Sequence, residues 1–105
     1  MEQEIKHLRQ QIDAVNDELL ALFLRRMALC KTIGICKRAH GLPILDVVRE
    51  EQMLTRLDEN SIPEIRPYVR RWFETMLILS REYQAECLYA CNAQEKYPLC
   101  KEKDH

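Results

Sequence analysis

Apolar residues recur every three or four positions along the N-terminal part of the chain, which is the spacing of one face of an α-helix. They are Ile5, Leu8, Ile12, Val15, Leu19, Leu22, Leu29, Ile33 and Cys36. No Pro interrupts this stretch, and Gly34 lowers the helix propensity without breaking the helix. After it, Gly41 gives the backbone extra freedom and Pro43 restricts it, so both favour the end of the helix. The pattern therefore predicts one long helix from about residue 2 to residue 38 or 39.

Two further segments have helical spacing, and polar residues and prolines separate them. Asp46 can cap a second helix over about residues 47–58. A third helix is predicted to start at residue 63 or 64 and to run to about residue 93, with Pro67 either in its first turn or delaying its start. Residues 94–105 have no periodicity, so we expect one helical domain over residues 1–93 followed by a disordered tail.

The length of the first helix predicts an oligomer. About 37 residues at 1.5 Å each give a rod of about 55 Å, whereas a compact domain of this size has a radius of gyration of about 13 Å. The two shorter helices can cover only one side of this rod. We therefore expect an all-α fold, with three helices per chain, in a symmetric homodimer of helical bundles.

Composition and charge exclude several classes of protein. Sixteen Lys and Arg against seventeen Asp and Glu give a net charge of -1, so no nucleic acid and no anionic membrane is expected as a partner. No apolar run approaches the roughly 18 residues of a membrane span, and the N-terminus is polar where a signal peptide is apolar. We therefore expect a cytoplasmic protein. The five cysteines lack CxxC pairs, so no metal site is predicted.

Charged residues stand at positions where the helical period calls for apolar ones. Arg26 continues a heptad-like series of Ile and Leu residues in the first helix, a spacing that favours it over Arg25 beside it. Lys37 follows at about 20° in azimuth and about 17 Å along the axis, so both cations can converge on one small anion. Arg9 lies about 25 Å from Arg26, so it can serve the same ligand only from the second subunit of an antiparallel dimer.

The other two helices carry polar residues on their inward faces as well. Glu50 lies within the apolar stripe of the second helix, and Asp46 and Arg49 share a side of its first turn. Ser80 and Gln84 interrupt the apolar series of the third helix. All three helices therefore contribute polar atoms to one seam.

Each of these residues also has a simpler explanation. Arg26 can extend to the surface or pair with an acid, and Arg9 can be a surface residue. Glu50 can form a surface pair with Arg49 or Arg56. Lys37 can be a solvated helix end, and Asp46 can be a cap only. Ser80 and Gln84 can belong to a satisfied hydrogen-bond network in the core. Their coincidence favours an anion site, because buried cations without enough acids to neutralise them need a bound anion.

Five segments, spread over the three predicted helices and the loop after the first, carry a resemblance to a known family. They read LRQQID, LLALFLRRMALCKTIGICK, GLPILD, DVVREEQML and SREYQ. In this pattern the chain resembles the all-helical chorismate mutase family of the shikimate pathway over about residues 5–88. The resemblance implies an intertwined homodimer with two active sites. It also implies an isomerase that converts chorismate to prephenate by a Claisen rearrangement, for phenylalanine and tyrosine biosynthesis, without cofactor or metal.

The resemblance also implies which residues contact the reacting part of the substrate. Arg9 matches the arginine that reaches one substrate carboxylate from the partner subunit, and Arg26 matches the arginine that binds the other carboxylate. Lys37 matches the lysine that touches a carboxylate and the ether oxygen, and Gln84 matches the amide at that oxygen. The resemblance thus implies four catalytic residues: Lys37, Gln84, Arg26 and Glu50.

The resemblance also implies which residues lie near the hydroxyl group of the substrate. Asp46 and Glu50 match the acids near it, Arg49 matches the arginine that supports them, and Ser80 is the other member of the polar pair on the third helix.

Two alternatives remain beside the mutase. An isochorismate-pyruvate lyase on the same fold would eliminate pyruvate from a related dicarboxylate, but the resemblance gives that branch an apolar residue at the Glu50 position and no match to Asp46. A noncatalytic helical dimerisation or regulatory module would have no need for Arg26, Lys37 and Gln84 together.

Overall fold

The structure, a computed structural model, describes residues 1–90 as three helices, with no strand among them. They are α1 (Glu2–Ala39), α2 (Val47–Glu59) and α3 (Arg66–Ala90). The predicted all-α class with three helices, one of them very long, is confirmed. The predicted end of the third helix at residue 93 and the predicted disordered tail lie outside the described residues.

The boundary between α1 and α2 follows the turn chemistry predicted from the sequence. Gly41 has a φ of +68°, a left-handed value that favours glycine, and the backbone N–H of Leu42 donates to the carbonyl oxygen of Lys37 at 2.7 Å. The side chain of Asp46 accepts a hydrogen bond from the backbone N–H of Arg49 at 3.0 Å, which confirms it as the cap of α2.

The predicted start of the third helix is wrong by two or three residues. Residues 63–65 form a turn, in which the backbone N–H of Ile65 donates to the carbonyl oxygen of Ile62, and the α-helix begins at Arg66. Pro67 therefore lies in the first turn of α3, where its missing N–H has no helical partner to lose. A helix that started at residue 63 would need the N–H of residue 67 to donate to the carbonyl oxygen of residue 63, and proline has no N–H, so the helix starts later.

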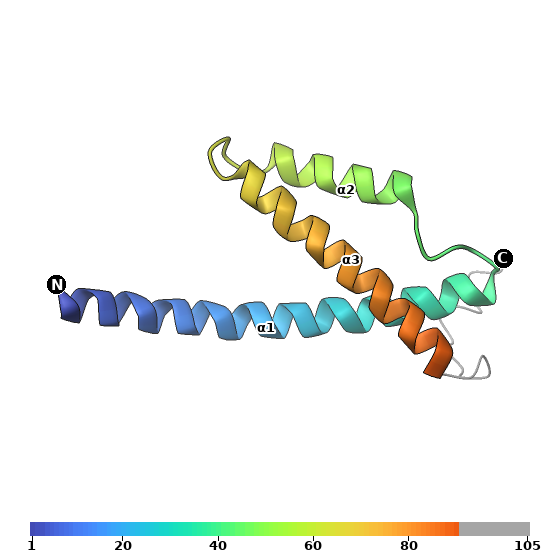
Figure 1. Cartoon of the computed structure of the whole chain (residues 1–105), viewed down its shortest axis with the longest axis horizontal. Helices are drawn as coiled ribbons and strands as arrows, with labels where there is room; N and C mark the ends of the chain where they lie inside the picture. The colour runs from blue at the N-terminus through green and yellow to red at the C-terminus, as the bar shows by residue number, and fades with distance from the viewer. Residues whose placement is uncertain (91–105) are drawn as a thin grey trace.

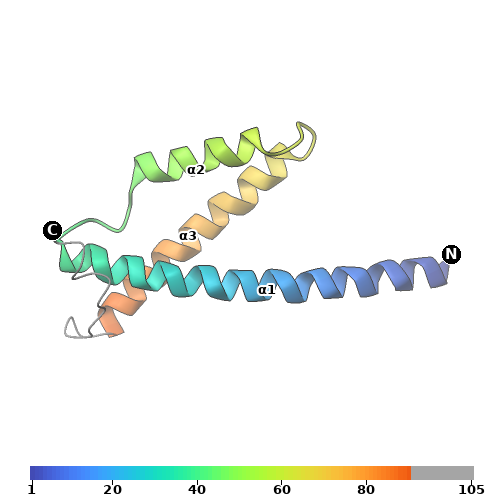
Figure 2. The same ribbon diagram turned by 180° about the vertical axis from the view of Figure 1, so that it is seen from behind.

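The helices are arranged around α3, which packs against both α1 and α2. Figure 1 shows α3 crossing the C-terminal half of α1 obliquely, while α2 lies to one side and joins α3 through a short turn. The opposite view in Figure 2 shows the N-terminal half of α1 extending well beyond the other two helices. The molecule is accordingly elongated, with principal-axis extents of 59 × 27 × 22 Å.

Within residues 1–90 the chain buries few apolar side chains and leaves a long apolar face open. The apolar side chains buried in this part of the chain are Cys30, Ile35, Leu54, Met76, Leu77 and Cys87. By contrast, the apolar stripe that predicted α1 is 40–58% exposed at Ile5, Leu8, Ile12, Val15, Leu19, Leu22, Leu29 and Ile33. No helix in the described part of the chain is long and apolar enough to cross a membrane.

Candidate active site

One cavity of about 150 Å³ lies where α1, the loop after it, α2 and α3 meet. Its lining includes seven of the eight polar residues predicted from the sequence: Arg26, Lys37, Asp46, Arg49, Glu50, Ser80 and Gln84. The fold thus brings together side chains that are far apart in the sequence, since 58 positions separate Arg26 from Gln84. Apolar side chains, among them Ile33, Met53 and Leu77, complete the wall.

Arg26 is held at the crossing of α1 and α3 by a hydroxyl group. Its Nη1 donates to Oγ of Ser80 at 2.5 Å, and Ser80 Oγ in turn donates to the carbonyl oxygen of Met76 at 2.8 Å. Ser80 is only 5% exposed, so this hydrogen bond is shielded from water. The guanidinium group is therefore oriented by a neutral partner, which leaves its positive charge available to an anion.

Lys37 fixes the loop that joins α1 to α2. Its Nζ donates to the carbonyl oxygen of Ile44 at 2.6 Å. An ammonium group has three donors, so this bond leaves two for the cavity. Within residues 1–90 no carboxylate lies within 4.0 Å of Arg26 or of Lys37. Two cations that line one cavity without an acidic partner favour an anionic ligand.

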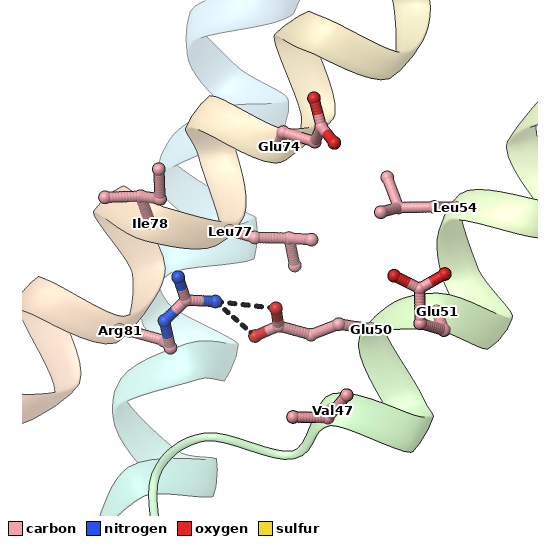
Figure 3. A pocket seen from close by; sticks show the side chains of 8 residues that line it. All are labelled: Val47, Glu50, Glu51, Leu54, Glu74, Leu77, Ile78 and Arg81. Carbon is pink, nitrogen blue, oxygen red and sulfur yellow. Dashed lines mark hydrogen bonds and ion pairs between the residues drawn. The ribbon is translucent and has the colours of Figure 1, made fainter.

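Glu50 forms an ion pair that the sequence did not predict. Its carboxylate accepts from Nη1 of Arg81, at 2.6 Å to Oε1 and 2.5 Å to Oε2, and Figure 3 shows this contact between α2 and α3. The alternative of a surface pair with a neighbouring arginine is wrong, because the partner is 31 positions away on another helix. Arg81 also lines the cavity. In the sequence, only the spacing of three residues between Arg81 and Gln84 indicates that both lie on the same face of α3.

Gln84 is buried and incompletely hydrogen-bonded. It is 6% exposed, and its Oε1 has no hydrogen-bond partner in the described part of the chain. The alternative of a satisfied core network therefore holds for Ser80 and fails for Gln84. Because a buried amide oxygen without a donor is unfavourable, this atom favours a ligand group that donates a hydrogen bond to it.

Arg9 is the one predicted residue that the cavity of a single chain does not include. It is exposed on α1, and its 17-residue separation from Arg26 corresponds to about 25 Å along the helix axis. The same chain therefore cannot bring both arginines to one small ligand.

The fold and the cavity together define a class of small all-α proteins with a cationic cavity between the helices. A family model for chorismate mutase type II matches residues 8–85, a range that includes α2, most of α1 and α3, and every residue assigned to the site. The chain belongs to the chorismate mutase type II family.

Several curated proteins are similar to the chain. A bifunctional chorismate mutase/prephenate dehydratase of Aquifex aeolicus is 32% identical over 89 residues, which are 82% of this chain and 23% of that protein. A T-protein of Haemophilus influenzae is 44% identical over 50 residues, 48% of this chain and 13% of that protein. A 3-dehydroquinate dehydratase of Pyrobaculum aerophilum is 43% identical over 49 residues, 47% of this chain and 16% of that protein. The chain thus spans less than a quarter of each of these relatives. No solved structure matches it.

Proposed function

We propose that this protein catalyses the Claisen rearrangement of chorismate to prephenate. The observation that carries the proposal is the cavity in which Arg26 and Lys37, two cations without acidic partners among residues 1–90, share the lining with the buried amide of Gln84. The name of the Aquifex aeolicus relative includes chorismate mutase, which supports this choice of reaction.

Binding the substrate in a compact shape is the first contribution of the site. Chorismate is a dicarboxylate that must adopt a diaxial conformation before its ends can react. Arg26 binds one carboxylate and Arg9 of a second subunit binds the other, so the two arginines hold the reacting atoms together and lower the entropic barrier. Asp46 and Glu50, with Arg49 beside them, hold the hydroxyl group.

Electrostatic stabilisation of the transition state is the second contribution. The breaking C–O bond leads the forming C–C bond, so negative charge develops on the ether oxygen. The ammonium group of Lys37 and the amide N–H of Gln84 stabilise this charge and therefore bind the transition state more tightly than the substrate. A millionfold acceleration requires about 8 kcal/mol. The rearrangement needs no nucleophile or general base, so the proposal assigns no covalent step to any side chain.

A homodimer is part of this proposal. The exposed apolar stripe of α1, 40–58% accessible at eight positions, supports a second copy as its cover, because a chain with so small a core gains stability by burying that stripe. An antiparallel arrangement of two α1 helices would also carry Arg9 of one subunit toward Arg26 of the other.

The test is an assay of the purified protein with chorismate, which follows substrate loss by absorbance and prephenate formation by chromatography. We expect turnover in the parent protein and a loss of turnover of at least about 100-fold in Arg26→Ala. A folded, dimeric parent protein that leaves chorismate unchanged would overturn the proposal. Release of pyruvate from isochorismate, without prephenate formation from chorismate, would favour the lyase instead.

A further inference from the structure

Glu50 and Arg81 form an ion pair that two pockets share. Both residues line the active-site cavity, and both also line a second pocket of about 370 Å³ between α2 and α3. The side chains are 21% and 31% exposed, respectively, so the pair is largely withdrawn from water. Figure 3 shows the guanidinium group reaching from α3 to the carboxylate that projects from α2, with Leu77 and Val47 on either side. The pair therefore closes the wall between the two pockets.

The contact fixes the direction of the Glu50 carboxylate. One nitrogen of Arg81 lies nearly equidistant from the two oxygens, at 2.6 and 2.5 Å. A glutamate side chain without such a partner samples several rotamers, whereas charge-assisted hydrogen bonds of this length hold it in one. A carboxylate has about four acceptor positions. Two bonds from Arg81 therefore leave room for a hydrogen bond from a ligand hydroxyl.

The charge of Arg81 also matters for the ligand. Two acids line the cavity, Asp46 and Glu50, and an unpaired carboxylate in a half-buried site repels a ligand that carries two carboxylates of its own. Arg81 offsets the charge of Glu50 at contact distance. The cavity can then offer a hydroxyl acceptor at Glu50 and still attract an anion.

We propose that Arg81 is a positioning residue, which holds the Glu50 carboxylate at the cavity wall in the orientation that accepts the substrate hydroxyl. This inference rests on the proposed mutase function and adds a residue to its site. The sequence resemblance assigned no role to Arg81.

Arg70 provides a matched control on the same helix. It pairs with residues of α2 as well, through Nη1 to Asp58 Oδ2 at 3.0 Å and Nη2 to Glu51 Oε2 at 3.9 Å, but it does not line the active-site cavity. Arg70 and Arg81 therefore both link α2 to α3, and only Arg81 does so through a residue of the site.

The experiment compares Arg81→Gln and Arg70→Gln in the full chain, each alone and combined with Glu50→Gln, by kcat, KM and Tm. We expect Arg81→Gln to lower kcat/KM by about tenfold or more, and Arg70→Gln to change it by less than about twofold. In a protein that already carries Glu50→Gln, Arg81→Gln should lower kcat/KM by less than about twofold further, because no charged carboxylate remains to be held. Arg81→Lys should recover part of the loss, since it keeps the charge.

The outcomes separate this inference from the proposed function. Equal losses in Arg81→Gln and Arg70→Gln, or an undiminished effect of Arg81→Gln beside Glu50→Gln, would overturn the role of Arg81 in a protein that is still a mutase. A folded parent protein without turnover would overturn both. If Arg81→Gln does not fold, Arg81→Met, which also removes the charge, takes its place, and a kcat/KM equal to that of the parent would then overturn the inference.

Discussion

Gly34 of α1 lies directly against Gln84 of α3. A Cβ atom at Gly34 would stand 3.0 Å from Cγ and 3.1 Å from Cβ of the glutamine side chain, and 3.6 Å from its Cα. The two helices thus approach so closely at this point that only a hydrogen fits between them. The contact sets the position of Gln84 in the cavity, and it gives a reason for a glycine in the interior of a long helix.

This contact predicts the effect of Gly34→Ala. Alanine at a helix-interior glycine ordinarily stabilises by about 1 kcal/mol, but here the methyl group meets the first carbons of Gln84, which move only if the backbone of α3 moves. We expect kcat/KM to fall by about tenfold or more with no gain in Tm.

Gly41→Ala is the control for that substitution. Gly41 has a φ of +68° and nothing within 4 Å of its added Cβ, so alanine there should destabilise the fold by about 1 kcal/mol and leave kcat/KM of the folded protein unchanged. A Gly34→Ala protein that is more stable and fully active would contradict this account of the contact.

Alanine substitutions of the neighbouring residues Arg25 and Arg26 should affect activity differently. Arg26 donates to Ser80 in the cavity, whereas Arg25 is exposed on α1. Arg26→Ala should therefore raise KM and lower kcat, with a combined loss of about 100-fold or more, and Arg25→Ala should stay within about twofold of the parent. Steady-state kinetics with chorismate measure both. Similar losses in the two variants would contradict the assignment of Arg26.

Lys37→Met should reduce turnover more than substrate binding. The ether oxygen gains charge only along the reaction, so removal of the ammonium group should lower kcat by about 100-fold or more and change KM much less. Because Lys37 also donates to the carbonyl oxygen of Ile44, circular dichroism and Tm should accompany the kinetics to show that the loop remains folded. Near-normal kcat with a raised KM would refute the electrostatic role.

Gln84→Glu should make the reaction depend on pH. An ionised carboxylate repels the developing charge on the ether oxygen, whereas a protonated carboxyl offers an O–H donor in place of the amide N–H. The value of kcat/KM should therefore fall with rising pH between about pH 4.5 and 8, while the parent profile stays flatter. Gln52→Glu, on the exposed face of α2, is the control for the same change and should follow the parent. Parallel profiles for Gln84→Glu and the parent would remove Gln84 from the ether oxygen.

The local parts of the fold could be predicted from the sequence because they depend on neighbours along the chain. The period of apolar residues, the φ required at Gly41 and the cap at Asp46 fixed the end of α1 and the start of α2. The start of α3 could not be fixed to the residue, because Pro67 is compatible with more than one position in a first turn.

The contacts between helices could be predicted only in part. Polar residues within the apolar stripes identified Arg26, Glu50, Ser80 and Gln84, and the helical period placed Lys37, Asp46 and Arg49 near them; all seven line one cavity. The partner of Glu50 and the reason for Gly34 were missed, because Arg81 and Gln84 reach them from another helix by a packing geometry that spacing within one helix does not encode.

A shared active site, formed by the three helices of one chain and Arg9 of another, is the central claim, and subunit mixing tests it directly. Arg9→Ala and Lys37→Ala proteins are each expected to be nearly inactive, since every site in each homodimer lacks one residue. After subunit exchange, half of the dimers should be mixed and one of their two sites intact, which gives about a quarter of the parent activity. An exchanged mixture that is dimeric and as inactive as its components would contradict the shared site.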